Sequence, residues 1–485
     1  MRESEAGMPE LSARELAQSC GGKLVRGDES TRISSYGIDT RRLNRESAFF
    51  ALLSERSDGH RFLGEARTAG AVAAIVQHVP DLENAPAVLI QVEDTTAALA
   101  ECGRAMRKRF SKATWIAITG SNGKTTTKEM VAAGLSAGFR VYRTPGNFNN
   151  HLGVPLTLLA CTDDVEFVVL EVAMSSPGEI AFLTELVDPD IALVTNVRAA
   201  HLENFSSIED IAAAKGEMFA VIRDDAVAVV NQDDVHVRVQ ATRHIGPQVT
   251  FGHDIGTDLR LEALDNRFVP GAGLTINHDG RSLRLQLKIG GGHAALNALA
   301  ALATVAAAGG DLTAAARKIE QLKPDRGRGE VHDLRRNIRV VDDCYNASPS
   351  AMASVLETLR QSDPRGRRVL IMGDMLELGH LGAALHREVG KLCGTSGIGM
   401  LVTIGNLSRG AAEAARRAGV PEVHHHADVD KATESIVEFL SDGDLIVVKG
   451  SRSMHLERIV RRLVEDLAPH QAPYGAAPTN HEAGT

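Results

Sequence analysis

Short, unbroken runs of apolar residues alternate with helical segments through most of this 485-residue chain, and this alternation limits the possible folds more than any other feature. Beyond residue 111 the runs are "WIAIT" (115–119), "EFVVLEV" (166–172), "IALVTNV" (191–197) and "AVAVV" (226–230). A strand that is apolar on both faces has to be covered on both faces, as in a parallel sheet between two layers of helices. The pattern therefore predicts an α/β fold with a parallel sheet at its centre.

The pattern changes at two places, which predict domain boundaries. A basic helix end near residue 110 closes a mixed α/β region, and the polar stretch "KPDRGRGE" (323–330) precedes a second α/β series. Between them, residues 249–290 switch to short alternating strands, which predict a small β appendage on the central domain. We predict three domains, at 1–108, 109–325 and 326–465, and a disordered tail at 466–485.

Composition excludes several classes of function. The net charge of −9 argues against a nucleic-acid partner, which requires basic patches. Five scattered cysteines without CxxC spacing indicate reduced thiols and no zinc cage. The first residues contain no apolar signal core, and the longest apolar runs have the length of strands. We therefore expect a cytoplasmic protein with no membrane span.

The segment "GSNGKTT" (120–126) follows the first strand of the central series and precedes helix-forming residues. Glycine and other small residues allow backbone N–H groups to approach phosphate oxygens, and a helix N-terminus adds positive potential. Lys124 can reach the β- and γ-phosphates, and Thr125 can bind Mg²⁺. Ile118 stands where the longer G-x-x-x-x-G-K-[ST] pattern has its first glycine. The alternative is a glycine turn with a chance lysine.

Two further residues are candidate metal ligands. Glu171 lies at the end of an apolar strand, where a carboxylate is costly unless it meets a cation such as Mg²⁺. The alternative is a solvated strand end. His201, in "RAAHLENF", is a second candidate, although a single histidine is more often structural or exposed.

Lys215 falls on the apolar stripe of a predicted helix in "SSIEDIAAAKGEMF" (206–219). One interpretation is a lysine whose stem is buried and whose ammonium reaches water. The other is a buried amine with a lowered pKa, which reacts with CO₂ to form a carbamate that ligates metal.

Polar side chains also gather in two loops. Asn147, Asn149 and Asn150 lie among glycine and proline in "YRTPGNFNNHLGVP" (142–155), which is either a turn-rich loop or a set of amides for a polar substrate. The tract "HHH" (424–426) lacks the spacing and acidic partners of a metal site, so we interpret it as an exposed loop.

Taken together, these motifs resemble the Mur ligase superfamily over about residues 20–460. "GSNGKTTTKEM", "TPGNFNNHLGVPLTLL", "PGEI", "ALVTNVRAAHLENF", "AKGEMF", "DDCYNASPSAM" and "GDMLELG" stand in that family's order. The resemblance implies an N-terminal UDP-binding domain, a central P-loop ATPase domain and a C-terminal Rossmann-like domain. "YNASPSAM" and "GDMLELG" favour the branch that joins D-alanyl-D-alanine to UDP-MurNAc-tripeptide for peptidoglycan synthesis. The implied cofactors are ATP, Mg²⁺ and CO₂, and we expect a monomer that acts on small molecules.

The resemblance also implies roles for particular residues. It assigns catalysis to Lys124, Lys215 and His201, and metal binding to Thr125, Glu171, His201 and a carbamate on Lys215. The implied ATP site is Gly120, Ser121, Asn122, Gly123, Lys124, Thr125, Thr126, Asn297, Arg328 and Asp343, with His293 less firmly. The implied substrate site is Thr40, Arg41, Asn147, Asn149, Asn150, Asn346, Lys449 and Ser451, with Arg42 in addition.

The chain departs from the family's pattern at Ala173, Ser176, Cys344 and Ser348, which concerns substrate contacts rather than the ATP machinery. Two rival functions remain at this point. One is another ligase of the superfamily, tripeptide-forming or folylpolyglutamate-forming, and the other is a non-catalytic nucleotide-binding protein. The third residue of the peptide, meso-diaminopimelate or lysine, stays open.

Overall fold

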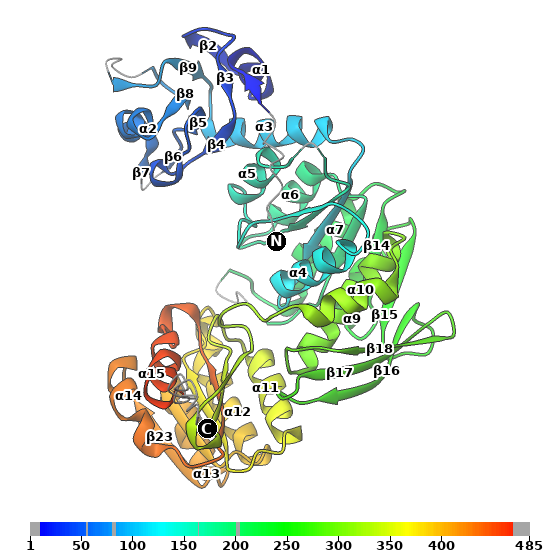
Figure 1. Cartoon of the computed structure of the whole chain (residues 1–485), viewed down its shortest axis with the longest axis vertical. Coiled ribbons are helices and arrows are strands. Elements are labelled where there is room, and N and C mark those ends of the chain that lie inside the picture. The colour runs from blue at the N-terminus through cyan, green and yellow to red at the C-terminus, as the bar shows by residue number, and fades with distance from the viewer. Residues whose placement is uncertain (1–9, 55–56, 80–83, 163, 200–203, 469–485) are drawn as a thin grey trace, which may run out of the picture. The chain divides into compact units, whose positions relative to one another are not determined.

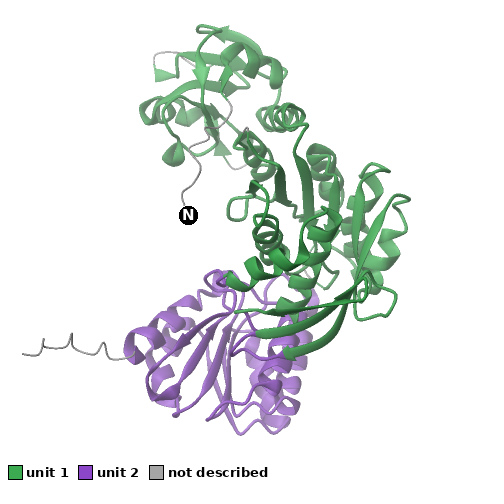
Figure 2. Ribbon diagram, turned by 45° about the vertical axis from the view of Figure 1, so that its right-hand side comes forward, with its two compact units in different colours: residues 1–265, 272–288, 292–322 green, residues 266–271, 289–291, 323–485 purple. Residues whose placement is uncertain are grey.

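The computed structural model describes residues 10–54, 57–79, 84–162, 164–199 and 204–468 (Figure 1). The chain divides into two compact units, one drawing on residues 1–265, 272–288 and 292–322 and the other on 266–271, 289–291 and 323–485 (Figure 2). The predicted tail begins just before the end of the described part, so its disorder stays a prediction. None of the described helices is long and apolar enough to cross a bilayer.

The first sheet of unit 1 has five strands in the order β2-β9-β8-β5-β4. β4, β5, β8 and β9 are parallel, and β2 is antiparallel to β9. The elements up to the boundary predicted after residue 108 are β1 (Leu11–Ser12), α1 (Ala13–Ser19), β2 (Lys23–Arg26), β3 (Arg32–Ile33), β4 (Ser35–Gly37), β5 (Ser47–Phe50), β6 (Leu53–Ser54), β7 (Ser57–Asp58), α2 (Leu63–Ala69), β8 (Ala71–Val76), β9 (Val88–Gln91) and α3 (Thr95–Arg109).

The second sheet of unit 1 has nine strands in the order β11-β12-β10-β13-β14-β15-β16-β17-β18. The strands from β11 to β16 are parallel neighbours, and β17 and β18 form an antiparallel hairpin. The predicted β appendage is thus hydrogen-bonded into the edge of the parallel sheet. The strands are β10 (Thr114–Thr119), β11 (Val141–Arg143), β12 (Phe167–Glu171), β13 (Ile191–Val194), β14 (Val227–Asn231), β15 (Gln248–Gly252), β16 (Leu259–Asn266), β17 (Ala272–His278) and β18 (Arg281–Gln286). The helices are α4 (Lys124–Leu135), α5 (Gly153–Leu159), α6 (Glu179–Val187), α7 (Ile208–Val221), α8 (Val235–Ala241), α9 (Gly292–Ala307) and α10 (Leu312–Gln321).

Unit 2 holds a six-stranded sheet in the order β19-β20-β24-β21-β22-β23, in which only β19 is antiparallel. The strands are β19 (Glu330–Asp333), β20 (Arg339–Asp342), β21 (Arg368–Gly373), β22 (Met400–Ile404), β23 (Glu422–His426) and β24 (Leu445–Lys449). The helices are α11 (Pro349–Gln361), α12 (Gly382–Thr395), α13 (Ser408–Arg417), α14 (Val429–Ser435) and α15 (Glu457–Leu467). The α/β class is confirmed in both units. The exact domain boundaries remain our proposal.

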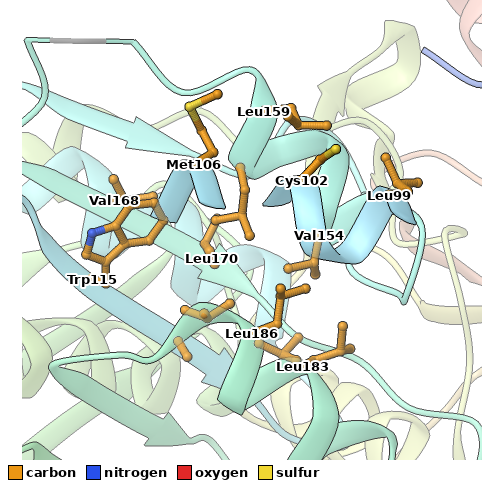
Figure 3. Packing of buried hydrophobic residues seen from close by; sticks show 14 of the residues in the cluster. Leu99, Cys102, Met106, Trp115, Val154, Leu159, Val168, Leu170, Leu183 and Leu186 are labelled. Carbon is orange, nitrogen blue, oxygen red and sulfur yellow. The ribbon is translucent and has the colours of Figure 1, made fainter. Parts of the chain in front are cut away.

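A large apolar core of unit 1 draws on residues from Leu11 to Ala241, and Figure 3 shows the part of it around α3. This part includes Leu99, Cys102 and Met106 of α3, together with Leu170 of β12 and Leu186 of α6. Full burial of each such large apolar side chain contributes about 1.5–3 kcal/mol to stability. All five cysteines are buried, and none of them forms a disulfide, which agrees with the reduced thiols predicted from their spacing.

Candidate active site

The phosphate-loop candidate lies between two strand ends of the nine-stranded sheet. β10 pairs with β12 on one side and with β13 on the other, and all three run in parallel. In this register Ile118 lies opposite Glu171, and Thr119 lies opposite Val194. The carboxyl ends of the three strands therefore meet at one edge, which is where open α/β sheets bind ligands.

Two glycines shape the loop between β10 and α4. Gly120 has φ +146° and Gly123 has φ +81°, both in the region that disfavours side chains. A Cβ atom would also collide with the Thr195 hydroxyl at Gly120 and with the Asn297 amide at Gly123. No side chain of the described residues caps the N-terminus of α4. The N–H groups and the dipole of a helix N-terminus attract an anion.

The segment that follows β13 holds the loop in shape. Ser121 donates its backbone N–H to Asn196 O at 2.9 Å, and Asn122 donates its own to Asn196 Oδ1 at 3.1 Å. The Thr195 hydroxyl donates to Asn122 O at 2.8 Å. The Ser121 hydroxyl in turn accepts from Arg198 N and donates to Arg198 O. Thr195 and Arg198 lie within the motif "ALVTNVRAAHLENF", which was the available signal, although neither residue was predicted to hold the loop.

Lys124 begins α4 and folds back over the loop. Its Nζ donates to Gly120 O at 2.8 Å and to Ser121 O at 3.4 Å, and the side chain is half-buried. Thr125 and Thr126 follow in the first turn of the helix and are also half-buried. The structure thus brings together all seven residues of the predicted loop, Gly120–Thr126.

Glu171 ends β12 with its side chain 1% exposed. Its Oε1 accepts from Asn149 Nδ2 at 2.7 Å, and its backbone N–H donates to the Thr144 hydroxyl at 3.0 Å. Oε2 is buried and has no hydrogen-bond partner among the described residues. The alternative of a solvated strand end is therefore wrong. A buried carboxylate oxygen without a donor beside a phosphate loop fits a divalent cation, for which oxygen is the preferred ligand.

Lys215 lies in α7 and is only 2% exposed, so its ammonium does not reach water. Burial, and secondly the positive charge of Lys124, hold the pKa of this amine well below its ordinary value. His201, the other residue predicted beside it, lies outside the described residues.

The three asparagines of the 142–155 loop have different roles. Asn149 contacts Glu171, whereas Asn147 is exposed. Asn150 holds the turn that leads into α5, because its Oδ1 accepts from Leu152 N at 3.2 Å and Gly153 N at 2.9 Å. The amide oxygen of Asn150 is thus engaged in structure, and its contact with substrate remains a prediction for Nδ2 alone.

The remaining predicted residues of unit 1 lie at two places. Asn297 is buried in α9, with its amide against Gly123 beside the loop, while His293 is exposed in the first turn of that helix. Thr40 and Arg41 lie in a short 3₁₀ helix (Thr40–Arg42) of the N-terminal region. Arg41 pairs with Asp39, and its hydrogen bonds lower the pKa of that carboxyl to about 2. Thr40 donates to Glu65 at 3.3 Å.

In unit 2, Lys449, Asp343 and Asn346 form one cluster at the ends of β24 and β20. Lys449 Nζ lies 2.7 Å from Asp343 Oδ2 and donates to Asn346 O at 3.0 Å. The Arg328 guanidinium stacks on the Tyr345 ring at 3.9 Å from its centroid. The Ser451 hydroxyl accepts from Leu376 N at 2.9 Å and so holds the "GDMLELG" loop.

The four departures from the family's pattern occupy ordinary backbone positions. Ala173 N–H donates to Asn149 O at 2.8 Å, and Ser176 N–H donates to Glu179. Ser348 caps α11, because its hydroxyl accepts from Ala351 N. Cys344 is buried, which raises the pKa of its thiol far above the ordinary value.

Two features differ from or extend the predictions. The "HHH" tract is not an exposed loop: it lies half-buried in β23, where His424 stacks on Phe439 at 3.9 Å. Edge strands often carry polar residues, so the hydropathy of this segment did not indicate a strand.

Glu217, two residues after Lys215, caps α6 by accepting from Gly178 N at 2.8 Å and Ala181 N at 3.0 Å. The "AKGEMF" motif was the available signal.

Comparisons with known proteins agree along the chain. Family models match in three places: "Mur ligase family, catalytic domain" at residues 32–107, "Mur ligase middle domain" at 118–305 and "Mur ligase, glutamate ligase domain" at 327–452. UDP-N-acetylmuramoyl-tripeptide–D-alanyl-D-alanine ligase of Bacillus subtilis is 35% identical over 94% of this chain and 99% of its own length. A crystal structure of MurF from Acinetobacter baumannii has a TM-score of 0.86 at 29% identity, covering 95% of this chain and 100% of that one. MurF of Thermotoga maritima in complex with ADP has a TM-score of 0.79 at 29% identity, covering 89% and 97%.

Proposed function

The chain belongs to the Mur ligase family, and we propose that it is the ATP-dependent ligase that joins D-alanyl-D-alanine to UDP-N-acetylmuramoyl-tripeptide in peptidoglycan synthesis. The geometric observation that supports an ATP-dependent reaction is a buried oxygen of Glu171 beside the phosphate loop, which has no hydrogen-bond partner among the described residues. The assignment of the two substrates rests on the similarity of nearly the whole chain to ligases of B. subtilis and A. baumannii.

The reaction requires activation of a carboxylate, because a carboxylate does not react with amines. The terminal carboxylate oxygen of the tripeptide attacks the γ-phosphorus of ATP, and the bond to the β-phosphate oxygen breaks to release ADP. The amine of D-alanyl-D-alanine then attacks the acyl phosphate. The tetrahedral intermediate expels phosphate, one proton leaves the nitrogen, and an amide remains. Three substrates have to be aligned, so most of the rate enhancement should come from positioning.

Residues of the loop fit the first step. The N–H groups at the start of α4 and the ammonium of Lys124 are placed to bind phosphate oxygens, after Lys124 gives up its present carbonyl partners. Glu171 and Thr125 would hold Mg²⁺, which when bound offsets the negative charge of the transferring phosphoryl group. Asn297, against Gly123, is placed beside the nucleotide. Arg328 and Asp343 are further candidates for contact with ATP.

We further propose that Lys215 carries a carbamate that joins Glu171 and His201 as a metal ligand. Support comes from its burial and lowered pKa, since only the neutral amine can form a bond to the carbon of CO₂, with loss of one proton to water. Lys215→Ala should lose activity and regain part of it with added short carboxylic acids, which can occupy the space of the carbamate. ¹³C NMR of the enzyme in labelled bicarbonate should show a carbamate resonance that Lys215→Ala lacks. A wild-type spectrum without that resonance would refute the modification.

The function is tested by phosphate release with ATP, Mg²⁺ and UDP-MurNAc-tripeptide, with and without D-alanyl-D-alanine, and by mass spectrometry of the product. Both tripeptides, with meso-diaminopimelate or lysine, should be offered. We expect dipeptide-dependent release and a pentapeptide product, both absent from Lys124→Ala. Phosphate release without that product would instead favour another ligase of the family, and no release with either tripeptide would refute the substrate assignment.

We also propose that the protein is a monomer and that it is cytoplasmic. They rest on the composition and on substrates that are small molecules. Light scattering should give the mass of one chain, 51.8 kDa, and a mass of two chains would contradict the first proposal.

A further inference from the structure

Lys128 is a fully buried lysine that the proposed reaction does not use. It lies four residues after Lys124 in α4, so the two side chains share one face of the helix. Its exposure is 0%, and its Nζ donates to Thr144 O at 2.8 Å and to Gly146 O at 3.2 Å. The same Nζ lies 3.1 Å from a carboxylate oxygen of Glu129. Three acceptors thus serve the three protons of the ammonium, which a buried cation requires.

The carbonyls that Lys128 binds belong to the segment 144–149, which surrounds Glu171. At one end of this segment the Thr144 hydroxyl accepts from Glu171 N at 3.0 Å. At the other end the Asn149 amide donates to Glu171 Oε1 at 2.7 Å, and Asn149 O accepts from Ala173 N at 2.8 Å. The segment therefore fixes both the backbone and the carboxylate of Glu171.

We propose that Lys128 is a positioning residue that fastens the segment 144–149 to α4 and thereby orients the Glu171 carboxylate relative to the phosphate loop. The ammonium acts through two backbone carbonyls and does not itself contact the reacting groups. Lys124 contacts the phosphate loop, and Lys128, one turn later in the same helix, contacts the segment that holds Glu171. The loop and the Glu171 carboxylate are therefore connected through a short series of hydrogen bonds. Only the kinetic part of this inference rests on the proposed function.

The charge arrangement explains why a lysine fits here better than a neutral donor. Glu129, which pairs with Lys128, also binds Arg143 of β11 at 2.6 Å. Glu129 is thus placed between two cations, one buried on α4 and one exposed on the strand that leads into the segment. A neutral side chain at position 128 would leave Glu129 with Arg143 alone and would supply fewer donors to the two carbonyls.

The structural part is tested by hydrogen exchange of the full chain without ligands. The amides of Glu171 and Ala173 are the reporters, because both donate to acceptors within the segment. In Lys128→Met we expect their exchange, followed by mass spectrometry of peptides across 168–175, to become at least about tenfold faster. Met130→Ala is the control: Met130 is buried in the same helix, two residues on and so on another face. It should lower the melting temperature and leave the two reporters unchanged.

The functional part is tested by the Mg²⁺ dependence of phosphate release. Removal of a residue that orients a metal ligand typically costs about 10–100-fold in metal affinity or activity. We expect the half-saturating Mg²⁺ concentration of Lys128→Met to rise into that range, while ADP binding in EDTA changes less than twofold. Lys128→Gln, which keeps two N–H donors without a buried charge, should fall between Lys128→Met and the wild type and provides the test if Lys128→Met does not fold.

Two outcomes would overturn the inference. The first is wild-type exchange at Glu171 and Ala173 in a folded Lys128 variant. The second is an equal change in Met130→Ala at matched stability, which would assign the effect to the helix as a whole. Neither outcome depends on which amine the enzyme accepts, so failure of the proposed function would show separately, in the product analysis.

Discussion

Lys449 and Asp343 are both predicted to contact ligands, yet they form a buried ion pair with each other in unit 2. The free energy of unfolding of their variants tests whether this pair stabilises the unit. Lys449 and Asp343 have side chains only 6% and 12% exposed, and Nζ and Oδ2 are 2.7 Å apart. Lys449 ends β24, and Asp343 directly follows β20, the parallel neighbour of that strand. We consider Lys449→Met, which keeps the length of the apolar stem and removes the charge, and Asp343→Asn, alone and together.

The magnitude follows from the distance and the burial. At 2.7 Å and an effective dielectric constant of about 20, the direct attraction is about 6 kcal/mol. Desolvation of both groups offsets much of it, so removal of one partner from a buried pair costs about 3–5 kcal/mol, mainly because the other charge stays buried and unpaired. We expect that loss for Lys449→Met. The double variant leaves neither charge, so its loss should be smaller than the sum of the single losses by about 2–3 kcal/mol.

The assay has to report on unit 2 by itself, because the single tryptophan, Trp115, lies in unit 1. Hydrogen exchange of the full chain at increasing denaturant, read on peptides across β20 and β24, provides the free energy of unfolding of that unit. A loss below about 1 kcal/mol for Lys449→Met, or losses that simply add in the double variant, would refute the reasoning. In either case Lys449 would be better described as a free ligand contact than as a partner of Asp343.

Three further predictions come from single positions. Gly123→Ala should weaken ATP binding at least about tenfold by calorimetry, because φ +81° and the Asn297 amide both oppose a Cβ; unchanged binding would contradict the loop geometry. Ser348→Ala should cost about 1 kcal/mol of unit 2 stability by loss of the α11 cap, whereas Ser348→Asn should be nearly neutral; equal losses would exclude capping. His386 accepts from Met375 N at 2.9 Å, and burial lowers its pKa. Because the unfolded state then binds the proton more readily, stability should fall as the pH drops below about 6.5, by at most about 1.4 kcal/mol per pH unit, and His386→Gln should lessen this slope in denaturant titrations.

The parallel sheets could be predicted because their signal is local. Each buried strand is a continuous apolar run, and the loop between β10 and α4 contains its own glycines and leads directly into the lysine that begins α4. The partners of the site residues could not be predicted in the same way, because they come from distant parts of the chain. Lys449 binds a carboxylate 106 residues earlier, and Asn149 rather than Asn150 contacts Glu171 because Asn150 is used to start α5. A motif indicates which residues belong to a site, but it does not indicate which of those residues form hydrogen bonds or ion pairs with each other.

The same distinction explains how a phosphate loop can form without the first glycine of the longer pattern. In this chain Ile118 is a core residue of β10, and the support for the loop comes from the side, where the segment after β13 provides hydrogen bonds from Thr195 and Asn196. That segment leads on toward α7, which carries Lys215, while Lys128 joins the other side of the loop helix to Glu171. The phosphate loop is thus hydrogen-bonded on one side to the segment that follows β13. On the other side, its helix is connected through Lys128 to the segment that holds Glu171, whose Oε2 has no hydrogen-bond partner among the described residues. A displacement of the loop helix should therefore be transmitted through Lys128 to the segment that holds Glu171, which is the physical reason to expect nucleotide and cation binding to be coupled in this enzyme.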